Sequence, residues 1–262
     1  MHTREEKLAA FNKVLDVLET LREKCPWDRK QTNESLRANT IEETYELADA
    51  LMADDNANIC KELGDVLLHV VFYSKIGEEK EAFDLADVCT KLTDKLIYRH
   101  PHIYGNVQAD TAEQVTSNWE KLKQTEKDGN KTVLGGVPRA LPAMIKAERI
   151  QEKAANVGFD WKNREDVWQK VKEETGEVQT EIEHKDKARL EAEFGDLLFA
   201  IINAARLYGV NPENALEHTN RKFISRFNYI EASARAQGKR VSDLTLAEMD
   251  ALWDEYKTKE EQ

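Results

Sequence analysis

Glycine, proline and cysteine are scarce in this sequence. Glycine occurs 11 times and proline 5 times in 262 residues, which disfavours a fold built from short strands and tight turns. The three cysteines, Cys25, Cys60 and Cys89, are widely spaced and form no C-x-x-C pair, which argues against a disulfide framework or a zinc site. We therefore expect a helical protein in a reducing compartment, the cytoplasm.

Long apolar runs and an excess of positive charge are also missing. The longest apolar runs, such as VLLHVVF and LLFAII, fall well short of the roughly 20 residues that cross a bilayer. The start, MHTREEKLAAF, has no apolar signal-peptide core. The net charge of -12 repels nucleic acid backbones and anionic membranes. We expect neither nucleic acid nor a membrane as a partner.

Strong helix formers are abundant, and apolar residues recur at helical spacing in both halves of the chain. No segment shows the alternation of a strand or a glycine-rich phosphate loop. The pattern predicts an all-α fold, with helices near residues 6–24, 36–53, 57–77, 82–99, 112–127, 140–156, 165–183, 187–208, 212–236 and 246–260.

The chain contains an internal repeat. Six positions of the first half recur 131 positions later, namely Glu42, Glu43, Glu46, Glu62, Gly64 and Asp65 as Glu173, Glu174, Glu177, Glu193, Gly195 and Asp196. Trp119 and Trp253 also correspond. Helix formers thin out in KDGNKTVLGGVP, residues 127–138. We predict tandem duplicated helical-bundle domains, residues 1–130 and 131–262.

The repeated positions place carboxylates on facing helices. Glu174 and Glu177 share one helix face, as do Glu193 and Asp196 on the next helix. The short link HKDK makes these helices antiparallel, so that Glu177 should face Glu193 and Glu174 should face Asp196. The first half repeats this arrangement with Glu43, Glu46, Glu62 and Asp65.

Four converging carboxylates repel one another unless a cation lies between them. Oxygen ligands favour Mg²⁺ or Mn²⁺. One alternative is a solvated acidic helix face. Another is a di-iron bundle, which needs Glu-x-x-His where this chain has aspartate, and we interpret His69 as an ordinary helix residue. Glu42 and Glu173, about 100° round their helices, are each either a water-orienting base or a solvated side chain.

Cations distinguish the two halves. Five basic residues near the second carboxylate set, Lys170, Lys172, Lys185, Lys187 and Arg189, correspond to Asn39, Ile41, Asp54, Asn56 and Asn58 in the first half. We therefore expect the second half to be catalytic and the first to be weak, regulatory or structural. Lys222 and Arg226 match Lys95 and Arg99 and do not discriminate. Trp253 either packs in the core or stacks on a nucleobase.

Several blocks of the chain resemble the MazG family of nucleoside triphosphate pyrophosphohydrolases, in its two-domain bacterial form. They are KCPWDRKQTNESL, YRHPHIYG, LGGVPRALPAMIKAERIQEKAANVGFDW and DALWDEYK, which surround the two EExxE and ExxD motifs. The resemblance implies the all-α NTP pyrophosphatase fold, a homodimer, and Mg²⁺ bound by the four carboxylates of each half. It also implies hydrolysis of NTP or dNTP to NMP and pyrophosphate, in control of nucleotide pools, with substrate contacts from the segment beginning at Lys222 and from Trp253.

Two other classes of function stay open from the sequence alone. The carboxylate sets of a nucleotide-sensing module would bind metal and nucleotide without turnover, and a helical scaffold would bind neither. Metal-dependent release of pyrophosphate distinguishes the enzyme from both alternatives.

Overall fold

The computed structural model describes residues 1–111, 114–115, 118–119, 122–123 and 132–260. All regular elements in these ranges are helical, which confirms the predicted all-α fold. The α-helices are α1 (Arg4–Lys24), α2 (Asn33–Met52), α3 (Asn56–Glu79), α4 (Leu85–Arg99), α5 (Pro101–Tyr104), α7 (Ala143–Ala155), α8 (Val167–His184), α9 (Lys187–Leu207), α10 (Pro212–Ala236) and α11 (Leu246–Glu260). In the described part of the chain no helix is both long and apolar enough to cross a membrane.

The chain divides into two compact units, Met1–Val115 and Thr116–Gln262. The boundary that the sequence predicts, near residue 130, falls in a segment outside the described residues. The domain limits 1–130 and 131–262 therefore stay predictions. Most of the helix predicted at 112–127 also lies outside the described residues.

The other predicted helices agree with the structure to within three residues at each end. The largest differences are at the start of α2, α4 and α7. At α2, Thr32 begins the helix earlier than the apolar pattern does, because its side chain accepts a hydrogen bond from the Ser35 amide. The four-residue α5 was not predicted, since one helical turn carries too few residues to show a period.

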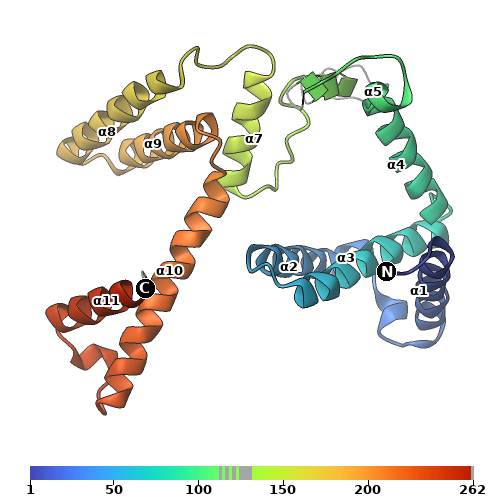
Figure 1. Ribbon diagram of the computed structural model, residues 1–262, viewed down its shortest axis with the longest axis horizontal. Coiled ribbons are helices and arrows are strands. Elements are labelled where there is room, and N and C mark those ends of the chain that lie inside the picture. Colours follow the sequence, from blue (N-terminus) through green and yellow to red (C-terminus); the bar gives the residue numbers. More distant parts are fainter. Residues whose placement is uncertain (112–113, 116–117, 120–121, 124–131, 261–262) are drawn as a thin grey trace. The chain divides into compact units, whose positions relative to one another are not determined.

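Two antiparallel hairpins, α2 with α3 and α8 with α9, dominate the packing (Figure 1). Their turns are equivalent. Asp54 and Lys185 both adopt the left-handed conformation, with φ of 51° and 58°. The next residues, Asp55 and Asp186, each accept hydrogen bonds from two amides at the start of the following helix. The repeated turn fixes the same register in both hairpins.

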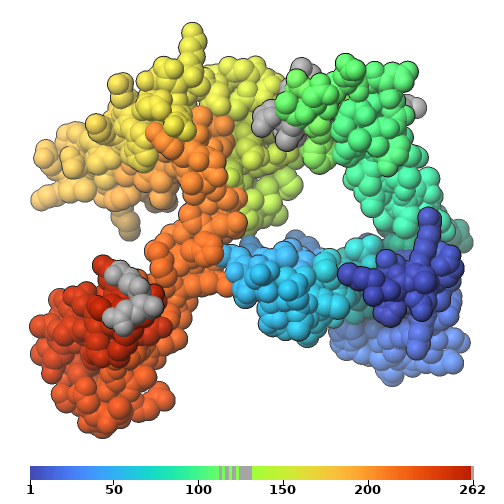
Figure 2. Space-filling view, viewed as in Figure 1, coloured from blue at the N-terminus to red at the C-terminus, as the bar shows by residue number. Residues whose placement is uncertain are grey.

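Each unit has its own apolar cluster. In the first unit, α1, α2 and α3 bury a core that consists of Leu18, Leu36, Val71, Phe72 and Ile76. In the second unit, Ile230 and Ala234 of α10 pack with Leu244 and with the apolar face of α11. The space-filling view shows α11 and the C-terminal half of α10 as one continuous body (Figure 2).

Candidate metal centre

The α8 and α9 hairpin brings three carboxylates together. Oxygens of Glu174, Glu193 and Asp196 lie within 4.8 Å of one another. An overlapping group joins Glu174 to Glu177 and Glu173 within the same limit. Glu174 is thus the shared member that connects all the carboxylates predicted in this half. The helix register set by the turn at Lys185 makes this convergence possible.

Glu174 is the most buried of these carboxylates, with 4% of its surface exposed. Its Oε1 lies 2.6 Å from the Lys170 Nζ, which also lies 2.7 Å from the Glu173 Oε1. These two contacts raise the pKa of Lys170. The Glu174 Oε2 is buried and has no hydrogen-bond partner. The close approach of the Glu174 carboxylate, followed by burial and the charges of Glu174 and Glu193, raises the pKa of Glu177.

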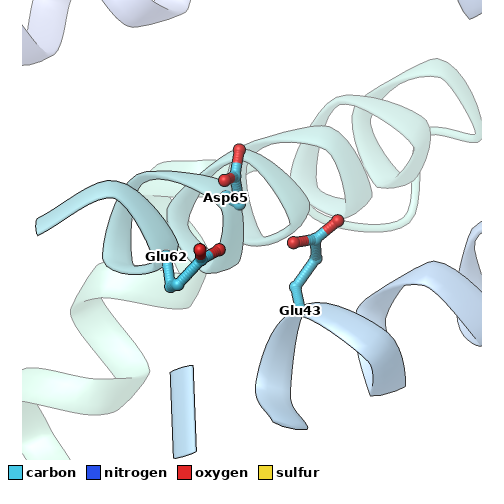
Figure 3. Close-up of side chains that lie close together, drawn as sticks. All are labelled: Glu43, Glu62 and Asp65. Carbon is cyan, nitrogen blue, oxygen red and sulfur yellow. The ribbon is translucent and has the colours of Figure 1, made fainter. Parts of the chain in front are cut away.

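The first half repeats the group of three. Figure 3 shows Glu43 of α2 reaching toward Glu62 and Asp65 of α3, and their oxygens lie within 4.8 Å of one another. Burial, followed by the charges of Asp65 and Glu46, raises the pKa of Glu43. Glu46 is exposed and lies outside this group of three, although its charge acts on Glu43. The predicted fourth carboxylate is therefore more peripheral than its three neighbours.

The donor set fits a hard divalent cation. All the grouped ligand atoms are carboxylate oxygens, which are the ligands of Mg²⁺ and Mn²⁺. Each group of three contains a buried carboxylate oxygen without a hydrogen-bond partner, Glu174 Oε2 in the second half and Glu62 Oε2 in the first. Glu181 Oε2 is also buried without a partner, outside these groups. A buried anionic oxygen without a partner is costly, and a cation would satisfy it.

No histidine belongs to the potential ligand groups of the described residues. His69 is buried, and its Nδ1 lies 3.0 Å from the Thr40 hydroxyl, which lies 2.6 Å from the Tyr73 hydroxyl. This histidine is part of a hydrogen-bonded network between α2 and α3. The arrangement does not support the di-iron alternative, which requires histidine ligands on the facing helices.

The predicted basic residues differ in their distance from the carboxylates. Lys170 contacts them directly. Arg189 lies one turn before Glu193 on α9, is largely exposed, and pairs with Asp186 at 3.5 Å. The first half also has a cation, which the comparison of equivalent positions missed. Lys61 lies 2.8 Å from Glu62, whereas its counterpart in the second half is Ala192.

Lys222, Arg226 and Trp253 lie on α10 and α11, and none of them contacts the carboxylate groups in the described interactions. Trp253 packs against the apolar cluster of these helices, with the Phe223 ring edge-on at 5.1 Å. The Arg226 guanidinium lies over the Trp253 indole at 5.3 Å and bonds to Glu260. Core packing, one of the two predicted roles of Trp253, is thus present, and the nucleobase contact stays a prediction.

Comparisons with known proteins identify relatives of both halves of the chain. The family model described as "MazG nucleotide pyrophosphohydrolase domain" matches residues 31–104 and again 162–230, which confirms two tandem copies. The chain is 39% identical over 257 residues to the "Nucleoside triphosphate pyrophosphohydrolase" of Escherichia coli (strain K12), covering 95% of this chain and 98% of the relative. It is 42% identical over 250 residues to the "Nucleoside triphosphate pyrophosphohydrolase/pyrophosphatase MazG" of Thermotoga maritima, covering 94% and 95%.

Proposed function

The chain belongs to the MazG family, and from this premise we propose that it is a Mg²⁺-dependent hydrolase that cleaves nucleoside triphosphates between the α- and β-phosphates. The observation that carries the proposal is the buried, unpartnered Oε2 of Glu174 beside Glu193 and Asp196. A triphosphate carries several negative charges, and this group of carboxylates cannot bind it without cations. Glu174, Glu177, Glu193 and Asp196 would hold the metal.

The reaction requires charge neutralisation and an oriented water. When bound, the divalent ion supplies positive charge at the phosphate oxygens and lowers the pKa of water. Glu173 is exposed beside the carboxylate group and is suited to accept the proton of the attacking water. The water oxygen bonds to phosphorus while the α–β bridge breaks, which releases NMP and pyrophosphate.

The chain's own cations would bind the substrate. Lys170 already reaches the carboxylate group, and in the complex it could turn from Glu173 to a phosphate oxygen. Arg189 is exposed one turn away from Glu193. Lys222, Arg226 and Trp253 are further contacts by the family resemblance. Because Lys170 and Arg189 are replaced by Asn39 and Asn58 in the first half, we assign catalysis to the second half.

Both hairpins expose an apolar stripe that supports a homodimer. On α9 the stripe consists of Phe194, Leu198 and Ile201, each between 45% and 55% exposed. The equivalent stripe on α3 consists of Leu63, Leu67 and Val70. Monomeric soluble proteins rarely leave such continuous apolar surface uncovered. The helical period places the α9 stripe opposite Asp196, so a second copy could cover it and leave the carboxylates accessible.

The test is a panel of NTPs and dNTPs incubated with the protein and Mg²⁺, with NMP, pyrophosphate and single phosphate separated. We expect NMP and pyrophosphate, and loss of both on addition of EDTA. The double variant Glu174→Ala and Glu177→Ala should lose turnover, whereas the matched first-half variant Glu43→Ala and Glu46→Ala should keep most of it. Single phosphate as the product would refute α–β cleavage. Nucleotide binding without any product, also with Mn²⁺, would instead support the sensing module.

A further inference from the structure

The two halves differ in the number of positions that could hold a cation. In the described part of the chain, the second half has two overlapping carboxylate groups and the first half has one. The groups of the second half together contain Glu173, Glu174, Glu177, Glu193 and Asp196. The group of the first half contains Glu43, Glu62 and Asp65. Each half also has a lysine whose ammonium contacts its carboxylates.

In the second half the lysine leaves room for a metal ion. Lys170 contacts Glu173 and Glu174, which both lie on α8. The group that spans both helices keeps its α9 carboxylates, Glu193 and Asp196, which form no ion pair among the described residues. The Oε2 of Glu174 also stays unpartnered, since Lys170 contacts the Oε1. A divalent ion can therefore bind beside Lys170 and compete with it only for Glu174.

In the first half the lysine contacts the group that spans both helices. The Lys61 Nζ lies 2.8 Å from the Glu62 Oε1. This hydrogen bond raises the pKa of Lys61, and the charges of three carboxylates raise it further, those of Glu62, Asp65 and Glu46. Asp65 lies on α3 and Glu46 lies on α2, so carboxylates of both helices attract the ammonium. The ammonium thus supplies the positive charge that a metal ion would otherwise supply.

This ion pair differs from an ordinary surface salt bridge. A pair between two exposed side chains contributes little to stability. Here the Glu62 side chain is 7% exposed, whereas the Lys61 side chain is 62% exposed. A buried carboxylate requires a cationic partner, which an ammonium or a metal ion can provide. Because the lysine is largely exposed, it can be displaced, and the two kinds of cation compete for Glu62.

The unpartnered oxygen of Glu62 indicates what a metal ion would gain. Lys61 contacts the Oε1, and the Oε2 is buried without a hydrogen-bond partner. Figure 3 shows the Glu62 carboxylate directed toward Glu43. A divalent ion between the three carboxylates could satisfy this oxygen, which Lys61 does not. Without Lys61, the first-half group should therefore accept a metal ion.

The contacting lysine stands on different helices in the two halves. Lys61 of α3 corresponds to Ala192 of α9. Lys170 of α8 corresponds to Asn39 of α2. On α8 the ammonium is shared with Glu173, which lies outside the group that spans both helices. On α3 it contacts a member of that spanning group, and the described part of the first half has no second group. One lysine is thus enough to fill the first half but not the second.

We propose that Lys61 occupies the cation position of the first half and competes there with divalent ions, so that the metal ion of the wild-type protein binds in the second half. The inference deepens the proposed function, because it names a residue that decides which half holds the metal ion. It rests on the proposed function only for the metal ion of the second half. It differs from the expectation, drawn from the family resemblance, of Mg²⁺ in both halves.

The test counts the Mn²⁺ ions bound per chain of the intact protein, by calorimetry and by the electron paramagnetic resonance of free Mn²⁺. We expect one equivalent in the wild-type protein and two in Lys61→Met. Adding Glu62→Gln to Lys61→Met should return the count to one. The matched control is Lys91→Met, which removes an exposed lysine of α4 outside the carboxylate groups and should leave one equivalent. In EDTA, Lys61→Met should melt below the wild-type protein, and Mn²⁺ should reverse this loss.

The reciprocal variant is Ala192→Lys, which places a lysine directly before Glu193 as Lys61 stands before Glu62. We expect the dissociation constant of Mn²⁺ at the second half to rise about 10–100-fold, as it does when groups around metal ligands are altered. Ala192→Met is the control for the added side-chain length, and it should leave this constant unchanged.

Other results would overturn the inference. Two equivalents of Mn²⁺ in the wild-type protein would do so, as would one equivalent in a folded Lys61→Met. If Lys61→Met does not fold in EDTA, Ala192→Lys decides, and an unchanged dissociation constant overturns the inference. If the wild-type protein binds no Mn²⁺, the metal dependence of the proposed function fails by itself. A gain of one equivalent in Lys61→Met would then still support the role of Lys61, and no gain would overturn it.

Discussion

Replacing Glu193 with glutamine should have opposite effects on the stability of the metal-free protein and on its activity. Glu193 lies within 4.8 Å of Glu174 and Asp196, and no ion pair of Glu193 occurs among the described residues. The substitution therefore removes repulsion without breaking a salt bridge. It also removes one of the charges that raise the pKa of Glu177. Glu193 is also one of the candidate metal ligands, so its replacement should weaken metal binding and lower activity.

The structure sets the size of both effects. Two unit charges 4.8 Å apart repel by about 3.5 kcal/mol at an effective dielectric constant of 20. Lys170 already neutralises part of the charge on Glu174, and Glu193 is partly solvated. We therefore expect a net gain of about 1–2 kcal/mol in the free energy of unfolding, with the melting temperature rising by about 2–4 °C for each kcal/mol. Loss of the ligand should lower kcat/KM by about 100-fold or more, because substitutions in the outer shell already cost roughly 10–100-fold.

The assay is thermal unfolding in EDTA at pH 8 and low salt, followed by unfolding and nucleotide hydrolysis in Mg²⁺. The control is Glu191→Gln, an exposed carboxylate on the same helix that belongs to none of the carboxylate groups. It should change neither quantity. The reasoning is wrong if Glu193→Gln destabilises the metal-free protein, or if it keeps wild-type turnover. A stability gain that persists undiminished in 1 M salt would also contradict an electrostatic origin.

Four further substitutions test the neighbouring groups. Glu174→Gln should reduce kcat/KM about 100-fold. The equivalent first-half variant, Glu43→Gln, should reduce it less than about twofold. Equal losses in steady-state assays would contradict the assignment of catalysis to the second half. The Lys170 Nζ lies 2.6 Å from Glu174 and competes with a metal ion for this carboxylate. Lys170→Met should therefore tighten Mn²⁺ binding in calorimetry while weakening nucleotide binding. Weaker Mn²⁺ binding would rule out this competition. The pKa of Glu177 is higher in the folded protein than in the unfolded chain. The ionised carboxylate therefore lowers the free energy of unfolding at high pH, and this destabilisation disappears as the pH falls and Glu177 becomes protonated. Glu177→Gln should thus stabilise the metal-free protein in urea unfolding at pH 8 and have no effect near pH 4, and a larger effect at pH 4 would reverse the inferred sign.

Local sequence signals predicted the helices and most of the carboxylate site. Helical period and capping residues determine where a helix runs, and a short turn determines that two helices are antiparallel. With the register known, the spacing of Glu174 and Glu177 against Glu193 and Asp196 leaves few arrangements. The structure places Glu174, Glu193 and Asp196 together as this argument requires. Glu46 lies outside the first-half group of three because an exposed glutamate has several rotamers, and the sequence does not select one.

Two features were not predicted, a contact between sequence neighbours and a cavity formed by distant segments. Lys61 pairs with Glu62, its immediate neighbour in sequence, although helix geometry alone would point the two side chains apart. An apolar cavity of the second unit combines α7, the loop that follows it and α9, and its walls depend on the turn at Gly158, three residues after the end of α7. The only available signal was the replacement of Phe72 by Asn203 between the repeats. That signal becomes informative once Phe72 is known to be buried.

The two repeats therefore share the same helical hairpin but differ in the side chains that pack on it. Burying a phenylalanine contributes about 1.5–3 kcal/mol, and the first half gains this at Phe72. The second half forgoes it at Asn203 and retains an open cavity between α7, the loop that follows it and α9. The first half therefore gains stability at this position, and Asn203→Phe should raise the free energy of unfolding of the second half by filling the cavity.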